Sequence, residues 1–405
     1  MKLNGTFSLI LTTALVFVFT CNMTFAADPV PLQRPALLAK ADKKSDLTLA
    51  PERQVIWQVW KNQFQTLKKR GVTKDQIVAF DHAPDEAKNK FGLLRIQIID
   101  QKIYLQSCKE HSHLDRADYW LKGLEKVVAK YKIKNVDLVL SYGDSPPIEF
   151  NGQTVSVPIM HADKPLRGDD ANIILVPDIY MISTWPKIYK KIKAAQGSYP
   201  WDKKSEKVFW RGAATGGNYD LTTYDKLPRL SLVMMSRSYP NKVDAKFTGD
   251  VQLSANASGQ ALQHVFTTLS LEGPRVKEVE HLAFKYLISM DGNVSAWLRP
   301  EWIMASNSVL MFQHRHEQWY YPAMKPWVHF VPLEDDISDV FEKLEWLRTH
   351  DAEARTISEN ANKFVETVLQ PEHITEDLAF LLNEYADLQN YELTEPTLPP
   401  AEVKK

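Results

Sequence analysis

The chain has 405 residues, of which 44% are hydrophobic and 24% charged, so it can bury a substantial core and is not a disordered chain. Its 49 Lys and Arg residues balance 50 Asp and Glu residues, and the formal net charge of -1 argues against a general nucleic-acid-binding protein. The two cysteines, Cys21 and Cys108, are too few for a disulfide framework or a cysteine-based zinc site.

The N-terminus has the pattern of a secretory signal peptide. Lys2 precedes an apolar stretch over residues 7–19, and small residues surround the expected cleavage point after Ala26. The stretch is short and interrupted by hydroxyl side chains, so a stable membrane span is not expected after cleavage. The sequence therefore predicts an exported protein, periplasmic or secreted, with an uncleaved anchor over residues 7–20 as the alternative.

Helical and strand patterns then alternate along the chain. The sequence predicts a helix over 55–69, a hairpin over 93–99 and 102–105, and a helix over 114–131. Short apolar runs predict buried strands at 136–141, 173–176, 207–210, 285–289 and 309–312. Helical patterns lie at 226–236, 300–305, 337–349 and 352–368. This alternation predicts an α/β fold with parallel sheets.

Composition changes divide the chain into segments. A signal peptide over 1–26 and a linker over 27–50 precede a first lobe over 51–197, and a second lobe spans 198–370. A C-terminal helix is expected over 371–393. The Pro-rich, charged tail over 394–405 is expected to be disordered.

Polar residues that directly follow predicted strands are the first candidates for a site, because ligands of open α/β sheets bind beyond the carboxyl ends of the strands. Asp144 follows the strand at 136–141 and could act as a general base, although a turn-forming role fits the same position. Arg211 and Gly212 open a small-residue segment after the strand at 207–210. Such a segment could bind a diphosphate or be a structural turn.

A second turn contributes further candidates. Asn293 and Ser295 follow the strand at 285–289, with Arg299 shortly after, and could hold phosphate or ribose oxygens or form an ordinary β-turn. Arg229, at the start of a predicted helix, could add a cationic contact or be solvated. The closely spaced histidines at 111–113 and 314–316 are expected to lie in surface loops, since no metal-binding spacing is present.

Several ordered blocks carry a resemblance to a known family. They are KYLISMDGNVSAW, SNSVLMFQ, EQWYYPAMKPWVHFVPLEDDISDVFEKLEWL and AEARTISENANKFVETVL, preceded by PWDKKSEKVFWRGAATGG and PRLSLV. Together they resemble glycosyltransferase family 90, the lipopolysaccharide-modifying and capsule-associated group that includes protein O-glucosyltransferases. The resemblance covers most of the region over 55–369.

The resemblance implies a GT-B-like fold of two Rossmann-like lobes with a cleft between them. It also implies an inverting glycosyltransferase that moves a sugar from a nucleotide sugar, expected to be a UDP-sugar, to a hydroxyl of a glycan, lipopolysaccharide or protein. Asp144 would be the catalytic base and Arg211, with Gly212, would hold the diphosphate. The other donor-binding candidates are Arg229, Asn293, Ser295 and Arg299.

No cofactor is expected, and no metal either. The sequence lacks the Asp-x-Asp pattern with which many sugar-nucleotide enzymes hold a divalent metal. Arginines and helix N-termini would then neutralise the leaving diphosphate.

The predicted export conflicts with a glycosyltransferase that uses a nucleotide sugar, because nucleotide sugars are not expected in a bacterial periplasm. Delivery into another cell, an uncleaved anchor or a misassigned start would each resolve the conflict. So would a different function class, a noncatalytic glycan-binding protein of the same fold.

Overall fold

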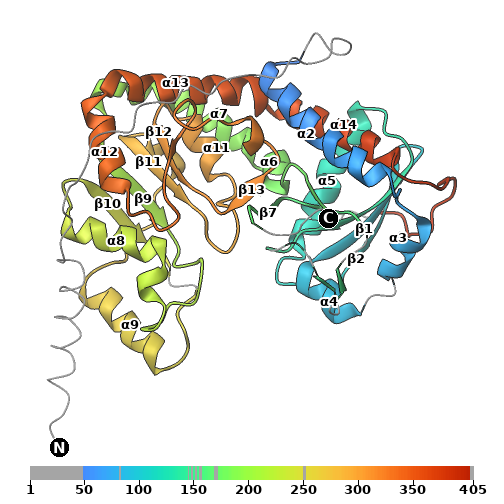
Figure 1. The fold of residues 1–405 in the computed structure, drawn as a ribbon, viewed down its shortest axis with the longest axis horizontal. Helices are drawn as coiled ribbons and strands as arrows, with labels where there is room; N and C mark the ends of the chain where they lie inside the picture. The colour runs from blue at the N-terminus through green and yellow to red at the C-terminus, as the bar shows by residue number, and fades with distance from the viewer. Residues whose placement is uncertain are drawn as a thin grey trace, which may run out of the picture. The chain divides into compact units, whose positions relative to one another are not determined.

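The structure, a computed structural model, describes residues 49–81, 84–144, 146, 149–150, 153–154, 157–167, 172–249 and 252–401. The predicted signal peptide and nearly all of the linker lie outside these residues. Residues from Ala50 onward form one unit, and both sheets described below belong to it (Figure 1). Within the described part of the chain, no helix has both the length and the apolar character needed to cross a lipid bilayer.

The N-terminal half is built on a mixed five-stranded sheet. Its strands, in spatial order, are β2 (Lys102–Ser107), β1 (Leu93–Ile99), β3 (Val136–Ser141), β6 (Ile159–His161) and β8 (Ile173–Leu175). The predicted hairpin forms the antiparallel pair β1 and β2, and β1 also pairs antiparallel with β3. From β3 onward the strands are parallel, as the continuous apolar run of β3 predicts.

The C-terminal half contains a fully parallel sheet. Its strands are β10 (Val243–Phe247), β9 (Ser205–Gly212), β11 (Phe284–Met290), β12 (Val309–Gln313) and β14 (Val331–Pro332). Every neighbouring pair runs parallel, and all five residues of β12 are buried. The structure thus confirms the predicted α/β fold: the sheet of the C-terminal half is fully parallel, and that of the N-terminal half is parallel from β3 to β8.

Helices and short elements complete the two halves. The N-terminal half has α2 (Pro51–Lys68), α3 (Lys74–Asp81), α4 (Asp85–Phe91), α5 (Asp115–Lys130), α6 (Ile179–Ser183), α7 (Trp185–Ala195) and a small β4 (Glu149–Phe150) and β5 (Gln153–Thr154) hairpin. The C-terminal half has α8 (Pro228–Ser238), α9 (Ala257–Thr268), α10 (Glu278–His281), α11 (Arg299–Met304), α12 (Val340–Thr349) and α13 (Asp351–Val368). The 3-10 helices are η1 (Gln196–Ser198), η2 (Trp201–Lys203), η3 (Tyr224–Lys226) and η4 (Tyr321–Ala323).

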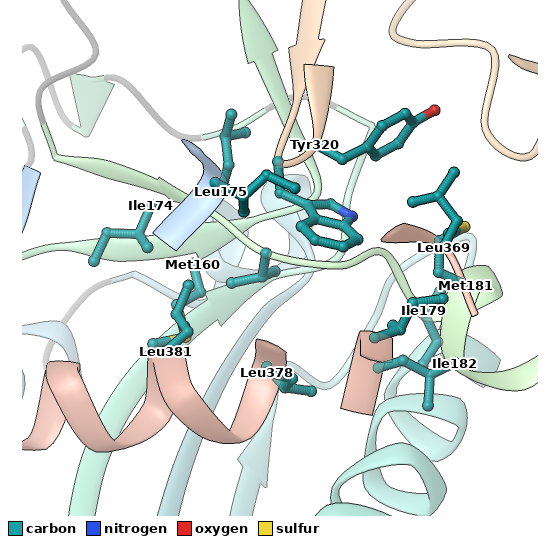
Figure 2. Packing of buried hydrophobic residues seen from close by; sticks show 14 of the residues in the cluster. Met160, Ile174, Leu175, Ile179, Met181, Ile182, Tyr320, Leu369, Leu378 and Leu381 are labelled. Carbon is teal, nitrogen blue, oxygen red and sulfur yellow. The ribbon is translucent and has the colours of Figure 1, made fainter. Parts of the chain in front are cut away.

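The last helix, α14 (Pro371–Ala386), returns to the N-terminal half and packs against α2, α5 and β3 (Figure 1). A buried ion pair fixes it there, since Arg53 of α2 donates to Asp377 of α14 at 2.5 Å. Figure 2 shows Leu381 of α14 beside Met160 of the sheet, with Leu378 on the same helix. These side chains belong to one apolar cluster that also contains residues of the C-terminal half.

A two-stranded ribbon also links the halves. β7 (Asp163–Pro165), which follows β6, pairs antiparallel with β13 (His316–Gln318), which follows β12. Asp163 lies opposite Gln318 in this ribbon, and His316 lies opposite Pro165. The loops at the carboxyl ends of β6 and β12 are therefore held together by backbone pairing.

The prediction of a disordered tail over 394–405 is wrong as far as residue 401. Leu398 is buried, Thr397 N–H donates to Gln97 Oε1 at 2.9 Å, and Leu105 N–H donates to Pro399 O at 3.1 Å. The physical reason is that β2 is an edge strand whose backbone groups need partners, and a Pro-rich segment is already extended enough to supply them. Residues 402–405 lie outside the described part.

This packing gives a stability prediction. Deleting residues 394–405 should lower the free energy of unfolding by about 2 kcal/mol, because a buried leucine and several backbone hydrogen bonds are lost. Thermal unfolding of the deletion variant beside a control lacking only 402–405 measures the effect. Identical midpoints in the two variants would show that the tail does not contribute to the fold.

Candidate active site

A cleft of about 560 Å³ lies at the carboxyl edge of the parallel C-terminal sheet. The loops that follow β9, β11, β12 and β14 line one side, and the segment at the end of β7 lines the other. The lining residues are Pro165, Leu166, Arg167, Gly216, Gly217, Gly292, Asn293, Arg315, His316 and Asp335. The position is the one expected for a ligand site, because all parallel strands deliver their following loops to the same edge.

Glycines let two of these loops approach each other closely. Gly216 has a φ of +97°, and its N–H donates to Asn293 Oδ1 at 3.2 Å and to Gln252 Oε1 at 2.9 Å. A Cβ atom on Gly292 would lie 2.7 Å from Thr215 Oγ1, so a larger residue there would push the loops apart. Asn293 is exposed in the cleft, and this wall is shaped by backbone rather than by side chains.

Arg229, at the second position of α8, holds the same two loops from behind. Its Nη1 donates to Ala213 O at 2.9 Å and to Thr215 Oγ1 at 2.6 Å, and its Nη2 donates to Met290 O at 3.0 Å. Its Nε donates to Asp291 O at 3.2 Å. Burial lowers the pKa of Arg229 from its usual value. Arg229 is thus a structural clamp on the loops and is not among the described residues that line the cleft.

Arg167 and Arg315 give the cleft its cationic character, and His316 also lines it. The backbone N–H groups of Arg315 and His316 donate to the buried Asp291 Oδ2 at 2.7 and 2.9 Å, which fixes their loop. The Nε of Arg315 is buried without a hydrogen-bond partner among the described residues. Arg315 also lines the cleft, which makes its guanidinium a candidate partner for an anionic ligand.

The prediction that 314–316 is a surface loop is wrong for His316, which belongs to a strand, whereas 314 and 315 do form a half-buried loop. His316 begins β13, which pairs directly with β7 at the edge of the cleft, and His314 stacks on Phe312 with ring centroids 4.4 Å apart. Arg315 could have been predicted as a site residue, since it closely follows the predicted strand at 309–312 just as Asp144 follows the strand at 136–141. The pairing of β13 with β7, a strand of the other half, could not be predicted from the sequence of either segment.

Arg211 does not lie among the described residues that line the cleft. Its Nη2 forms an ion pair with Asp244 Oδ1 at 2.8 Å, and its Nη1 donates to Trp210 O and Asp244 O. Gly212, the last residue of β9, packs so tightly on Trp210 that an added Cβ would lie 2.4 Å from its ring. Here Arg211 and Gly212 support the strand end that carries the cleft loop.

Arg299 and Ser295 are also engaged inside the protein. Arg299, the first residue of α11, donates from Nη2 to Arg211 O at 2.7 Å, and burial lowers its pKa to about 10. Ser295 is buried, and its N–H donates to Asp163 Oδ2 at 2.8 Å. Of the predicted donor-binding residues, Asn293 faces the cleft, and the others build its walls from behind.

Asp144 lies in the N-terminal half, in the loop after β3. Its side chain is 42% exposed, and Arg116 Nη1 donates to its Oδ1 at 3.0 Å. Arg116 also lies over the ring of Trp297, 4.9 Å from the ring centroid. Trp297 follows Asn293 in the same loop, so Asp144 is connected through one arginine to the loop that lines the cleft.

The clamp makes a testable prediction. Replacing Arg229 by Ala leaves several carbonyl oxygens without their donor and should lower the free energy of unfolding by about 1–3 kcal/mol. The variant should also bind ligands in the cleft more weakly, because both loops lose their common anchor. Arg237→Ala, an exposed position on the same helix, is the matched control. Equal thermal midpoints and equal ligand affinity in the two variants would contradict the clamp.

The comparisons with a family profile and with individual proteins agree on one family of glycosyltransferases. The sequence profile of Glycosyl transferase family 90 matches residues 57–401. Protein O-glucosyltransferase 2 of Danio rerio is 27% identical over 330 residues, covering 78% of this chain and 60% of the relative. Protein O-glucosyltransferase 1 of Homo sapiens is 29% identical over 217 residues, covering 53% and 50%. The chain thus spans about half to three-fifths of the length of these two relatives.

A solved structure of Anabaena HepE in complex with UDP-glucose is similar over 52% of this chain and 57% of that chain, with 14% identity and a TM-score of 0.33.

Proposed function

The chain belongs to glycosyl transferase family 90, and we propose that it transfers a sugar from a nucleotide-sugar donor to a hydroxyl group of a protein, glycan or lipopolysaccharide. The observation that carries the proposal is the cleft at the carboxyl edge of the parallel sheet, with Arg167, Arg315 and His316 on its walls. Its volume of about 560 Å³ lies within the range of small-molecule sites. A noncatalytic glycan-binding protein would have little use for two arginines around such a cleft.

We propose a UDP-sugar as the donor. The diphosphate would lie beside the guanidinium of Arg315, with Arg167 and His316 close by, because anions bind most strongly to charged donors that are partly shielded from water. Arg315 takes the role that the family resemblance gives to Arg211, whose guanidinium is paired with Asp244. Asp335 could accept hydrogen bonds from ribose or sugar hydroxyls.

The reaction would be a single displacement with inversion. Asp144 accepts the proton of the acceptor hydroxyl, and the hydroxyl oxygen bonds to the anomeric carbon as the bond to the diphosphate oxygen breaks. The arginines of the cleft offset the charge that develops on the leaving UDP, so no metal is needed in this scheme. The names of the relatives favour glucose as the sugar and a protein hydroxyl as the acceptor.

Calorimetric titration with UDP tests the donor site. The wild-type protein should bind UDP with and without a chelator, and Arg315→Ala should weaken binding about 10- to 100-fold, the loss expected for a charge-assisted hydrogen bond. Arg211→Ala is the matched control and should change the affinity much less. Loss of binding in Arg211→Ala alone would restore the diphosphate role to Arg211. A folded wild-type protein that binds no UDP would favour the glycan-binding alternative.

Asp144→Asn tests the base. This substitution keeps the size of the side chain but removes its proton-accepting charge, so transfer should fall by about 100-fold or more while UDP binding stays within about twofold. Product formation from UDP-glucose measures transfer, and calorimetry measures binding. Substantial turnover by the variant would remove Asp144 from the mechanism.

A further inference from the structure

Two buried side chains connect the loop of Asp144 to the loop of Asn293. His161, the last residue of β6, and Asp163, the first residue of β7, are each 1% exposed. His161 Nδ1 lies 2.6 Å from the backbone oxygen of Asp163 and 3.4 Å from its Oδ1. Neither residue lines the cleft among the described residues, and neither is used by the proposed chemistry.

His161 contacts the loop that carries the proposed base. Its Nε2 lies 3.2 Å from Gly143 O, the carbonyl of the residue immediately before Asp144. The backbone of Gly143 is itself fixed, because its N–H donates to Phe91 O at 3.1 Å and an added Cβ would lie 2.7 Å from the same oxygen. A shift of His161 would therefore move the peptide between Gly143 and Asp144, which orients the Asp144 side chain.

Asp163 contacts the loop that lines the donor side of the cleft. Its Oδ2 accepts the Ser295 N–H at 2.8 Å, and Gln318, its partner in the β7–β13 ribbon, donates to Ser295 Oγ at 3.1 Å. Ser295 is two residues beyond Asn293, which faces the cleft. The carboxylate thus reaches from the N-terminal half to the donor loop of the C-terminal half.

The electrostatics agree with an ionised carboxylate. Burial alone would raise the pKa of Asp163, but the hydrogen bond and charge of His161 and the Ser295 N–H outweigh it, so the pKa is lowered from its usual value. A buried charge is an expensive way to fill space between two loops, and an apolar pair of similar size would serve a packing role at less cost. What the Asp163 side chain adds is a hydrogen-bond acceptor at a fixed direction and distance from the Ser295 N–H.

We propose that His161 and Asp163 are positioning residues that hold the Asp144 loop in register with the donor loop over 291–297. The inference rests on the proposed function. The relative position of the two loops matters for the reaction only if Asp144 in one half must lie close to a sugar donor bound by the other half. Displacing a reacting group by about 1 Å can cost roughly 100-fold in rate. Breaking the pair should therefore lower kcat while the donor still binds normally.

The test compares Asp163→Ala with Asp163→Asn. The Ala variant removes the acceptor of the Ser295 N–H, and its kcat for transfer from UDP-glucose should fall about 10- to 100-fold, with the KM for UDP-glucose unchanged within about twofold. The Asn variant keeps a carbonyl oxygen for that N–H and should recover most of the rate. Asp377→Asn, a buried aspartate away from the cleft, is the control for general destabilisation and should leave kcat unchanged.

Hydrogen exchange provides a readout that does not depend on turnover. Asp163→Ala should speed amide exchange both at 142–144 and at 291–297, whereas Asp377→Asn should affect neither segment. Faster exchange in one segment alone, an unchanged kcat in Asp163→Ala, or a rise in the KM for UDP-glucose equal to the fall in kcat would each overturn the positioning role. A wild-type protein that turns over no donor would instead contradict the proposed function, while exchange would still report on the link.

Discussion

The parallel arrangement of β9, β11, β12 and β14 is the constraint on which the candidate site depends. Because the strands run the same way, the loops after them meet at one edge, and the chain concentrates its small and cationic residues there. The shared strand direction brings these loops together but does not by itself fix their conformation. The guanidinium of Arg229 bonds to carbonyl oxygens of two of them and gives the cleft a fixed wall.

Buried charged side chains fix the loops around the cleft, and one of them reaches across from the N-terminal half. Asp291 fixes the loop of Arg315, Arg229 fixes the glycine loop, and Asp163 reaches from the other half to the donor loop. Each of these groups is costly to bury and is offset by hydrogen bonds to backbone. Their concentration around one cleft, linked to Asp144 through Arg116, is the pattern expected of a catalytic site that spans two halves of a protein.

Much of the fold could be predicted from the sequence, because a continuous apolar run such as that of β3 is typical of a strand buried on both faces. The direction of a single side chain could not. Arg211 follows a predicted strand, as the loop rule requires, yet Asp244 on the neighbouring strand captures its guanidinium, and only the pairing of β9 with β10 reveals this. The ribbon of β7 and β13 and the packing of the tail on β2 likewise depend on partners far away in the chain.

A crystal structure of the protein with UDP bound tests the central claim most directly. The account predicts that the diphosphate lies in the cleft between the loops after β9 and β11, within hydrogen-bond distance of the Arg315 guanidinium, while the ion pair of Arg211 and Asp244 stays intact. A diphosphate bound to Arg211 with that ion pair broken, or UDP bound away from the carboxyl edge of the parallel sheet, would contradict it.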